Sequence, residues 1–295
     1  MKIKSLYIML FILVLILVAC SNEIDSDLKK YKREMKPLYN KEDAIKNDIG
    51  TLNLEQLDQL IGTEVTVEKQ DELNQFQNKL EEDILPEIKD LRKQVKHIDT
   101  KTDEVKEVQD IYIHNVKHKE NIISELNKYV TLFKQSIHSN EKILQYTKVF
   151  EQNKSDAEKN AKLAKNNPDD KEDYESLVTV IDKNSEELSG KAKFLNETHS
   201  ANEKSDYIDD EVVPIFKKDI KSLNQLNISS NKVNRMRQSQ IEMYYTLIKY
   251  YQERKNSIMI EDKLQKIAAP SSINTQLTTL GRDEKYEKAI NRLEK

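Results

Sequence analysis

Residues 69–98 read KQDELNQFQNKLEEDILPEIKDLRKQVKHI. Apolar side chains recur in this stretch every three or four positions, at Leu73, Phe76, Leu80, Ile84, Ile88, Leu91, Val95 and Ile98. This spacing places one apolar stripe along an α-helix and leaves the remaining surface polar. The stretch therefore predicts a long amphipathic helix that needs partner helices to cover its stripe.

The same spacing continues along most of the chain. Apolar stripes run over residues 105–150, 174–195, 212–226 and 233–267. Polar turns separate them, most clearly at 166–170 and 229–231, and a capping segment at Thr100–Asp103 precedes the first. Residues 64–67 come nearest to the period of two that marks a strand. The pattern predicts an all-α fold, an elongated antiparallel bundle of long helices.

The composition favours the same class. The 295 residues include four glycines, five prolines and no tryptophan. Parallel α/β folds, β-sandwiches and phosphate-binding loops depend on glycine-rich turns, so most enzyme architectures are excluded. Lys and Arg number 48 against 52 Asp and Glu, a net charge of −4. This balance gives no indication of a nucleic-acid partner.

A short internal repeat lies within the helical region. The segments Glu82–Pro86 and Asp210–Pro214 match in pattern and are 128 positions apart, with similar apolar spacing after each proline. Met35–Tyr39 is a degenerate third copy around Pro37. We interpret the repeat as two antiparallel helical hairpins packed together, with the prolines kinking or starting helices. The exact breaks near Pro37, Pro86, Ser155, Ser200 and Pro214 stay open at this point.

The N-terminus has the features of an export signal. Lys2 and Lys4 precede an apolar run from Leu6 to Val18, which is shorter than the roughly 20 residues that span a bilayer as a helix. The run ends Leu17-Val18-Ala19-Cys20, a match to the bacterial lipobox, and Cys20 is the one cysteine of the chain. We expect a diacylglyceryl thioether on Cys20 and no other cofactor, disulfide or cysteine-based metal site. An ordinary signal peptide with a chance cysteine is the alternative.

These features suggest a division of the chain. The expected segments are a signal peptide at 1–19, an N-terminal helical segment at 20–68, a long-helix bundle at 69–268, and a linker with a short charged helix at 269–295. The bundle would hold the repeats at 69–166 and 169–268. Removal of residues 1–19 takes away two lysines and changes the net charge from −4 to −6. Two or more acyl chains bind a protein stably to a membrane without help from its charge, so we expect the lipid on Cys20 to determine membrane attachment.

Few residues suggest chemistry. His114 and His118 are spaced i, i+4, but neighbouring lysines disfavour a cation there, and we predict no metal site and no catalytic residue. The acidic runs at 81–83 and 209–211 are explained by helix starts or kinks. Four tyrosines, Tyr244, Tyr245, Tyr250 and Tyr251, form the strongest candidate binding surface, because exposed rings stack on sugars or partner proteins. Tyr244 and Tyr251 also continue the apolar stripe, so a core role is the simpler interpretation.

The lipobox at 17–20 and the sequence Glu242-Met243-Tyr244-Tyr245 together resemble the staphylococcal EMYY-motif lipoproteins. The resemblance covers the whole chain, and it implies a location at the cell envelope without an established activity. The architecture is also similar, more loosely, to helical lipoproteins of Gram-positive bacteria that are linked to cell-wall binding.

We expect a non-enzymatic lipoprotein on the outer face of the cytoplasmic membrane, held by its lipid, whose helical body binds a cell-wall polymer or another envelope protein. A passive spacer or an envelope assembly factor is the first alternative. A transport-linked solute receptor and an envelope enzyme are weaker alternatives, because the chain has few glycines and no nucleophile, zinc or phosphate-loop motif.

Overall fold

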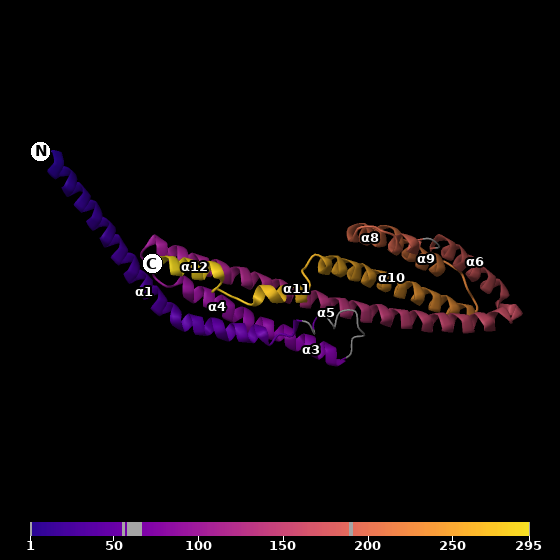
Figure 1. Ribbon diagram of the computed structural model, residues 1–295. Helices are drawn as coiled ribbons and strands as arrows, with labels where there is room; N and C mark the ends of the chain where they lie inside the picture. Colours follow the sequence, from indigo (N-terminus) through magenta and orange to yellow (C-terminus); the bar gives the residue numbers. More distant parts are fainter. Residues whose placement is uncertain (1, 55–56, 58–66, 189–190, 295) are drawn as a thin grey trace. The chain divides into compact units, whose positions relative to one another are not determined.

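The computed structural model describes residues 2–54, 57, 67–188 and 191–294, with the backbone alone for residues 2–21, 67, 192, 271, 274 and 275. Within these ranges the chain forms helices and no strand, which confirms the all-α prediction (Figure 1). Residues 64–67, which come nearest to a two-residue period in the sequence, lie outside the described residues except for the backbone of residue 67. The chain divides into two compact units, Met1–Thr131 with Ile267–Lys295 (unit 1) and Leu132–Lys266 (unit 2).

Unit 1 combines the N-terminal helix, a helical hairpin and the C-terminal helices. Its elements are α1 (Lys2–Gly50), α3 (Val67–Asn78), the π-helix η1 (Lys79–Ile84), α4 (Leu85–Lys96), the first part of α5 (Asp103–Lys165), α11 (Pro270–Ile273), the 3-10 helix η4 (Asn274–Leu277) and α12 (Glu284–Leu293). α4 and α12 both pack on α1. The core comes from apolar side chains of these helices, including Met35, Ile45, Ile88, Leu91, Val95, Val105 and Val116.

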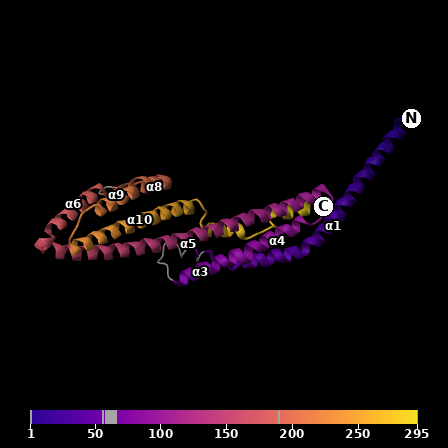
Figure 2. The same ribbon diagram turned by 180° about the vertical axis from the view of Figure 1, so that it is seen from behind.

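Unit 2 holds a second helical hairpin. Its elements are the remainder of α5, the 3-10 helix η2 (Pro168–Asp170), α6 (Lys171–Leu188), α7 (Lys191–Asn196), α8 (Ala201–Tyr207), the π-helix η3 (Ile208–Val212), α9 (Val213–Asn224) and α10 (Asn231–Gln265). α10 packs along α8 and α9, and α6 packs on α9, as both ribbon views show (Figures 1 and 2). The main core cluster includes Leu177, Phe216, Leu223, Val233, Met236 and Tyr244.

A π-helix interrupts the stripe at 69–98 that we predicted as one continuous helix. In an α-helix the ring of Pro86 would collide with the carbonyl four residues earlier, and proline has no N–H to donate. The N–H of Leu85 donates instead to the carbonyl of Leu80, five residues back. The π-helix ends at Ile84, two residues before the proline, and Pro86 lies in the first turn of α4. The prediction that this proline kinks or starts a helix is therefore confirmed.

The second copy of the repeat, around Pro214, also has a π-helix before its proline. The N–H of Val213 donates to the carbonyl of Ile208, and Pro214 lies in the first turn of α9. The spacing of 128 holds for whole elements: α4 spans 85–96 and α9 spans 213–224, while α5 and α10 begin at 103 and 231. Each unit thus contains one of the two repeated helical hairpins predicted from the sequence.

Side chains close both hairpin turns in the same way. Gln109 Nε2 donates to the carbonyl of Ile98 (2.9 Å), and Arg237 Nη1 donates to the carbonyl of Leu226 (2.8 Å). Both residues of the second pair lie 128 positions after those of the first. The two hairpins therefore share their turn geometry although the capping side chain has changed from an amide to a guanidinium.

The helix that precedes each hairpin also contributes to the turn. Asp27 of α1 accepts hydrogen bonds from the backbone N–H groups of residues 101–102, at 2.8 and 2.9 Å. Asp173 of α6 accepts them from residues 229–230, at 2.8 and 2.7 Å. Although burial raises the pKa of Asp27, the hydrogen bonds outweigh it and the pKa is lowered. α1 and α6 are corresponding helices, offset by 146 positions, and the repeated structure has three helices.

Helix boundaries elsewhere agree in part with the predictions. The capping box at Ser200 and Glu203 is present, and Ser230 caps α10. α5 continues through Ser155 to Lys165, so the break considered there does not occur. Pro37 lies inside α1.

The segment after Pro270 differs from its prediction as a polar linker. Ile273, Leu277 and Leu280 are buried in unit 1. The short charged helix expected near the C-terminus is α12, and it buries Tyr286 and Ile290. The C-terminal segment is therefore part of the core of unit 1, because its few apolar residues recur at spacings that face α1 and α5.

Candidate functional site

The EMYY motif lies on α10 and presents two faces. Met243 and Tyr244 are buried, whereas Glu242 and Tyr245 point to solvent. Neighbouring helical residues are about 100° apart around the axis, so two adjacent tyrosines project in different directions. Tyr244 is 3% exposed and Tyr245 is 48% exposed. The motif therefore supplies one core tyrosine and one surface tyrosine.

The other two tyrosines of the predicted surface are half-buried. The ring of Tyr251 stacks on Phe216, with 5.7 Å between ring centroids, and Tyr250 meets Tyr251 edge-on at 5.3 Å. The structure confirms the core interpretation for Tyr244, so this residue does not belong to the candidate binding surface. Tyr245 is the one member of the four that is classed as exposed.

Tyr244 meets two polar side chains inside unit 2, Asn184 of α6 and Asp219 of α9. The Asn184 amide nitrogen, in the orientation that satisfies its neighbours, donates to Asp219 Oδ1 (3.1 Å) and to the carbonyl of Val180 (3.2 Å). Burial raises the pKa of Tyr244, and hydrogen bonds to Asn184 and Gln240 partly oppose this. Burial and, to a lesser degree, the negative charge of Glu187 raise the pKa of Asp219 to about 6.

A second buried polar cluster lies in unit 1 and joins α1, α5 and α12. The rings of Tyr112 and Tyr286 meet edge-on at 5.2 Å between centroids, and Tyr39 lies 6.3 Å from Tyr112. The hydroxyls of Tyr39 and Tyr286 share a hydrogen bond of 2.5 Å, and Tyr286 also donates to the hydroxyl of Tyr31 (3.3 Å). Burial raises the pKa of all four hydroxyls, so they remain protonated donors.

Glu42 of α1 is the charged centre of this cluster and is 1% exposed. Its carboxylate accepts from the Tyr112 hydroxyl (2.8 Å), the Gly281 N–H (2.9 Å), the Arg282 N–H (3.0 Å) and Arg282 Nε (2.9 Å). Arg282 also lies over the ring of Tyr39 and reaches Asp43 at the surface. Each carboxylate oxygen of Glu42 thus accepts two hydrogen bonds, and such full pairing is the condition for a stable buried ion pair.

This second cluster was not predicted from the sequence. Its tyrosines come from helices separated by up to 255 positions in sequence, so no local pattern connects them. One signal was available. Gly281 is one of four glycines in the chain, and a Cβ at this position would lie 2.2 Å from the ring of Tyr112. Because glycine is scarce in this chain, a glycine at 281 could have indicated a position where the backbone lies close to another side chain.

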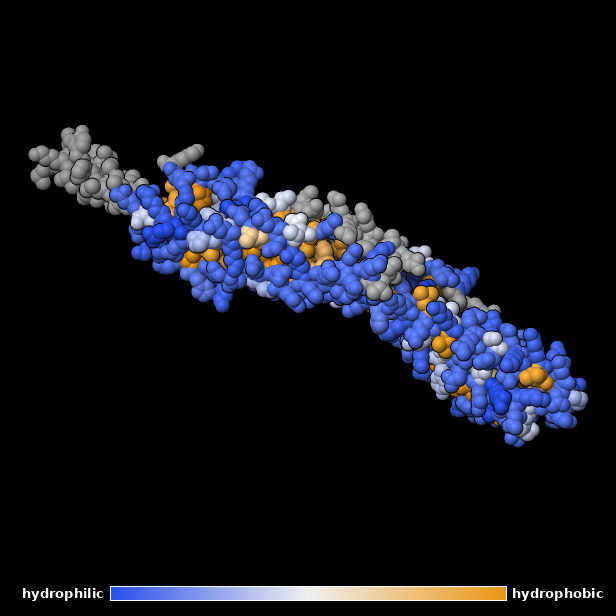
Figure 3. All heavy atoms as spheres, turned by 90° about the horizontal axis from the view of Figure 1, so that it is seen from below, coloured by the Kyte–Doolittle hydropathy of each residue, from blue (hydrophilic) through white to orange (hydrophobic). Residues whose placement is uncertain are grey.

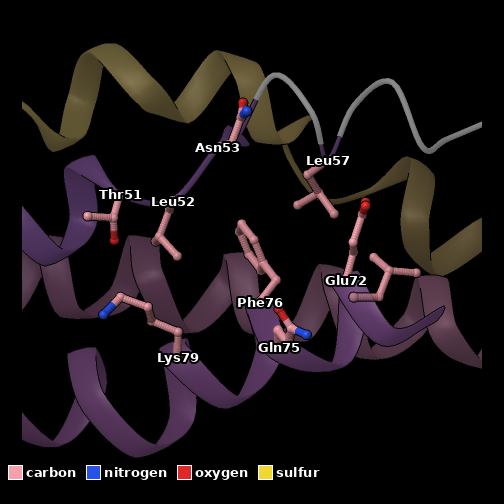
Figure 4. Close-up of a pocket in the computed structure, with 9 residues that line it drawn as sticks. Thr51, Leu52, Asn53, Leu57, Glu72, Gln75, Phe76 and Lys79 are labelled. Atoms are coloured by element: carbon pink, nitrogen blue, oxygen red, sulfur yellow. The ribbon is translucent and has the colours of Figure 1, made fainter. Parts of the chain in front are cut away.

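A pocket of about 230 Å³ lies between the end of α1 and α3 in unit 1. Leu52, Leu57 and Phe76 point toward one another inside it, while Lys79 lies at its edge (Figure 4). Ligand pockets usually have volumes of roughly 300 Å³ or more. Residues 58–66, between the end of α1 and α3 in sequence, lie outside the described residues. We assign no ligand to this pocket.

The remaining candidates have surface roles. His114 and His118 are exposed on α5, and the described residues contain no group of three His, Cys, Asp or Glu side chains placed to hold a metal ion. The acidic runs at 81–83 and 209–211 lie on the exposed sides of the two π-helices. Lys191 pairs there with Glu211 at 2.7 Å. These carboxylates form surface ion pairs and hydrogen bonds.

The lipobox residues Leu17, Val18 and Ala19 and the acceptor Cys20 fall within the backbone of α1. Their side chains lie outside the described residues, so lipidation of Cys20 stays a prediction. In the part of the chain that the structure describes, no helix has an apolar stretch long enough to cross a membrane.

The fold and the motif together define an all-α protein built on a duplicated three-helix unit. The chain belongs to the family of EMYY-motif containing lipoproteins, whose family model matches residues 1–294. This confirms the resemblance carried by Glu242–Tyr245, and membership implies attachment to a membrane through lipid. No curated protein and no solved structure matches the chain.

Proposed function

We propose that this protein is a non-catalytic interaction module anchored to the outer face of the cytoplasmic membrane. Cys20 carries a diacylglyceryl thioether after residues 1–19 are removed. Membership in a lipoprotein family, the small residues before Cys20 and the absence of any other cysteine in the sequence support this anchor. Because α1 contains Cys20 and belongs to unit 1, the anchor is joined directly to that unit.

Unit 2 is the part that binds a partner. The observation that carries this assignment is the distribution of exposed apolar side chains. Among the residues whose side chains are described, the large apolar residues with high exposure all lie in unit 2: Leu144, Val149, Leu163 and Tyr245. Single exposed apolar residues are ordinary, but their restriction to one of two related units is not expected from folding alone.

Exposed polar residues lie close to these side chains in sequence, among them Gln145, Lys148 and Glu242. Hydrophilic residues cover most of the face seen in Figure 3, with smaller groups of apolar residues between them. An exposed aromatic ring in such surroundings suits a partner that offers both apolar faces and hydroxyl groups, as sugar rings do. A cell-wall polysaccharide is therefore the proposed partner, and an envelope protein is the alternative.

Co-sedimentation with purified cell wall tests this function. The mature chain from residue 21 is expected to sediment with the wall in moderate salt, and Tyr245→Ala is expected to weaken binding about tenfold, because truncation of an aromatic anchor typically costs more than 1 kcal/mol. Helicity should not change, since Tyr245 makes little contact with the core.

Lys117→Ala is the matched control. Lys117 occupies the position of unit 1 that corresponds to Tyr245, and its side chain has a similar exposure of 47%. This variant should bind as the original protein does. Failure of the original protein to sediment would reject the wall polymer as partner, and an equal loss in both variants would reject unit 2 as the binding unit.

A further inference from the structure

The core of unit 2 contains three polar side chains at positions that are apolar in unit 1. The correspondence follows from the offset of 146 between α1 and α6 and of 128 between the hairpins. The pairs are Leu38 and Asn184, Leu91 and Asp219, and Val116 and Tyr244. All six side chains are buried. At these three positions unit 1 has hydrocarbon side chains, whereas unit 2 has an amide, a carboxyl and a phenol.

The carboxyl group of Asp219 is the least satisfied member of this polar centre, which we define as Asn184, Asp219 and Tyr244. Asp219 has no exposed surface. Its Oδ1 accepts from Asn184, whereas its Oδ2 has no hydrogen-bond partner among the described residues. Burial without a neighbouring cation and a full set of hydrogen-bond donors strongly disfavours the ionised form of a carboxyl group.

The charges around Asp219 do not compensate for its burial. Glu187 on α6 adds a second negative charge, and Lys218 on α9 adds a positive one. The ammonium group of Lys218 pairs with Glu187 at 2.6 Å on the outside of the unit. From α10, the group that faces Asp219 is the neutral hydroxyl of Tyr244. The nearby cation is thus already engaged with another carboxylate.

We propose that the polar centre is a pH-responsive switch that loosens the packing of α6, α9 and α10 when Asp219 loses its proton. In the protonated state the three helices stay closed around a neutral centre. In the ionised state the carboxylate draws water into the core and separates α9 from α6. Unit 1, with leucine and valine at the corresponding positions, does not respond.

The direction of the effect follows from linkage. The pKa of Asp219 is about 6 in the folded unit and 3.8 is its ordinary value. An acid whose pKa is raised by folding stabilises the folded state below its ordinary pKa, and that stabilisation is lost as the pH rises through the folded value. The contribution of Asp219 to the stability of unit 2 therefore falls between about pH 4 and pH 6 and stays low above.

Hydrogen exchange of the full chain across pH 4 to 7 tests this proposal, with rates corrected for the intrinsic effect of pH. The protection of amides in α6 and α9 is expected to fall about fiftyfold over this range. In Asp219→Leu, which restores the residue type of unit 1, this fall should disappear. Asp219→Asn, which keeps the shape but cannot ionise, should behave in the same way.

The corresponding amides of α1 and α4 provide an internal control, because they belong to the unit with Leu91. A fall of equal size in both units would overturn the proposal. The same conclusion would follow if the original protein and Asp219→Asn lost protection in parallel. Partner binding plays no part in this measurement, so its outcome is independent of the proposed wall interaction.

Discussion

Replacement of Gly281 by alanine is expected to destabilise unit 1 by about 3 kcal/mol, at the upper end of the usual cost of overpacking. The added Cβ would lie 2.2 to 2.6 Å from three ring carbons of Tyr112. That ring cannot move aside, because it is fully buried and its hydroxyl is bound to Glu42. Chemical denaturation monitored by circular dichroism would measure the loss.

Gly50→Ala is the matched control for this prediction. A Cβ at Gly50 would meet no heavy atom within 4 Å. Alanine also has a better helix propensity than glycine, so this variant should be as stable as the original protein or slightly more stable. Equal destabilisation by the two substitutions would show that the close approach of Gly281 to Tyr112 is not the cause.

Glu42→Ala is expected to have the largest effect of any single substitution, a loss of about 4 kcal/mol. Removal of one partner of a buried ion pair leaves the other charge uncompensated, which typically costs 3–5 kcal/mol. Here the Tyr112 hydroxyl, two backbone N–H groups and Arg282 Nε would all lose their acceptor. Because these donors come from α5 and the segment before α12, the C-terminal helices should detach from α1 before the rest unfolds.

Asp43→Ala provides the comparison, because Asp43 pairs with the same guanidinium from the surface and its side chain is 53% exposed. An exposed ion pair contributes about 1 kcal/mol or less. Limited proteolysis near residue 281, followed by mass spectrometry, would distinguish the two variants. Similar protease sensitivity in Glu42→Ala and Asp43→Ala would contradict the central role of the buried carboxylate.

The helices could be predicted from the sequence because their evidence is local. Apolar residues spaced by three and four produced the stripes, and Ser200 with Glu203 produced a capping box that the structure contains. Pro86 and Pro214 marked the two places where a regular α-helix could not continue. The sequence did not indicate that a π-helix would precede each proline.

The polar clusters could not be predicted because they depend on tertiary contacts. In the sequence, three tyrosines of the unit 1 cluster each fit the apolar stripe of a different helix: Tyr31, Tyr112 and Tyr286. They come together only when α1, α5 and α12 pack. Asp219 has polar neighbours in sequence at 217–218, so nothing local indicates that its side chain is buried. Its burial can be inferred only from the spacing of 128 between the two repeats, which places Asp219 at the position of the buried Leu91.

Photo-crosslinking in intact cells tests the central claim, that unit 2 is the partner-binding part of a lipid-anchored protein. A photoreactive residue would replace Tyr245 in one full-length variant and Lys117, its counterpart in unit 1, in another. We expect a crosslinked product of reduced gel mobility from position 245 and none from position 117. A product from position 117 alone, or equal products from both positions, would contradict the account.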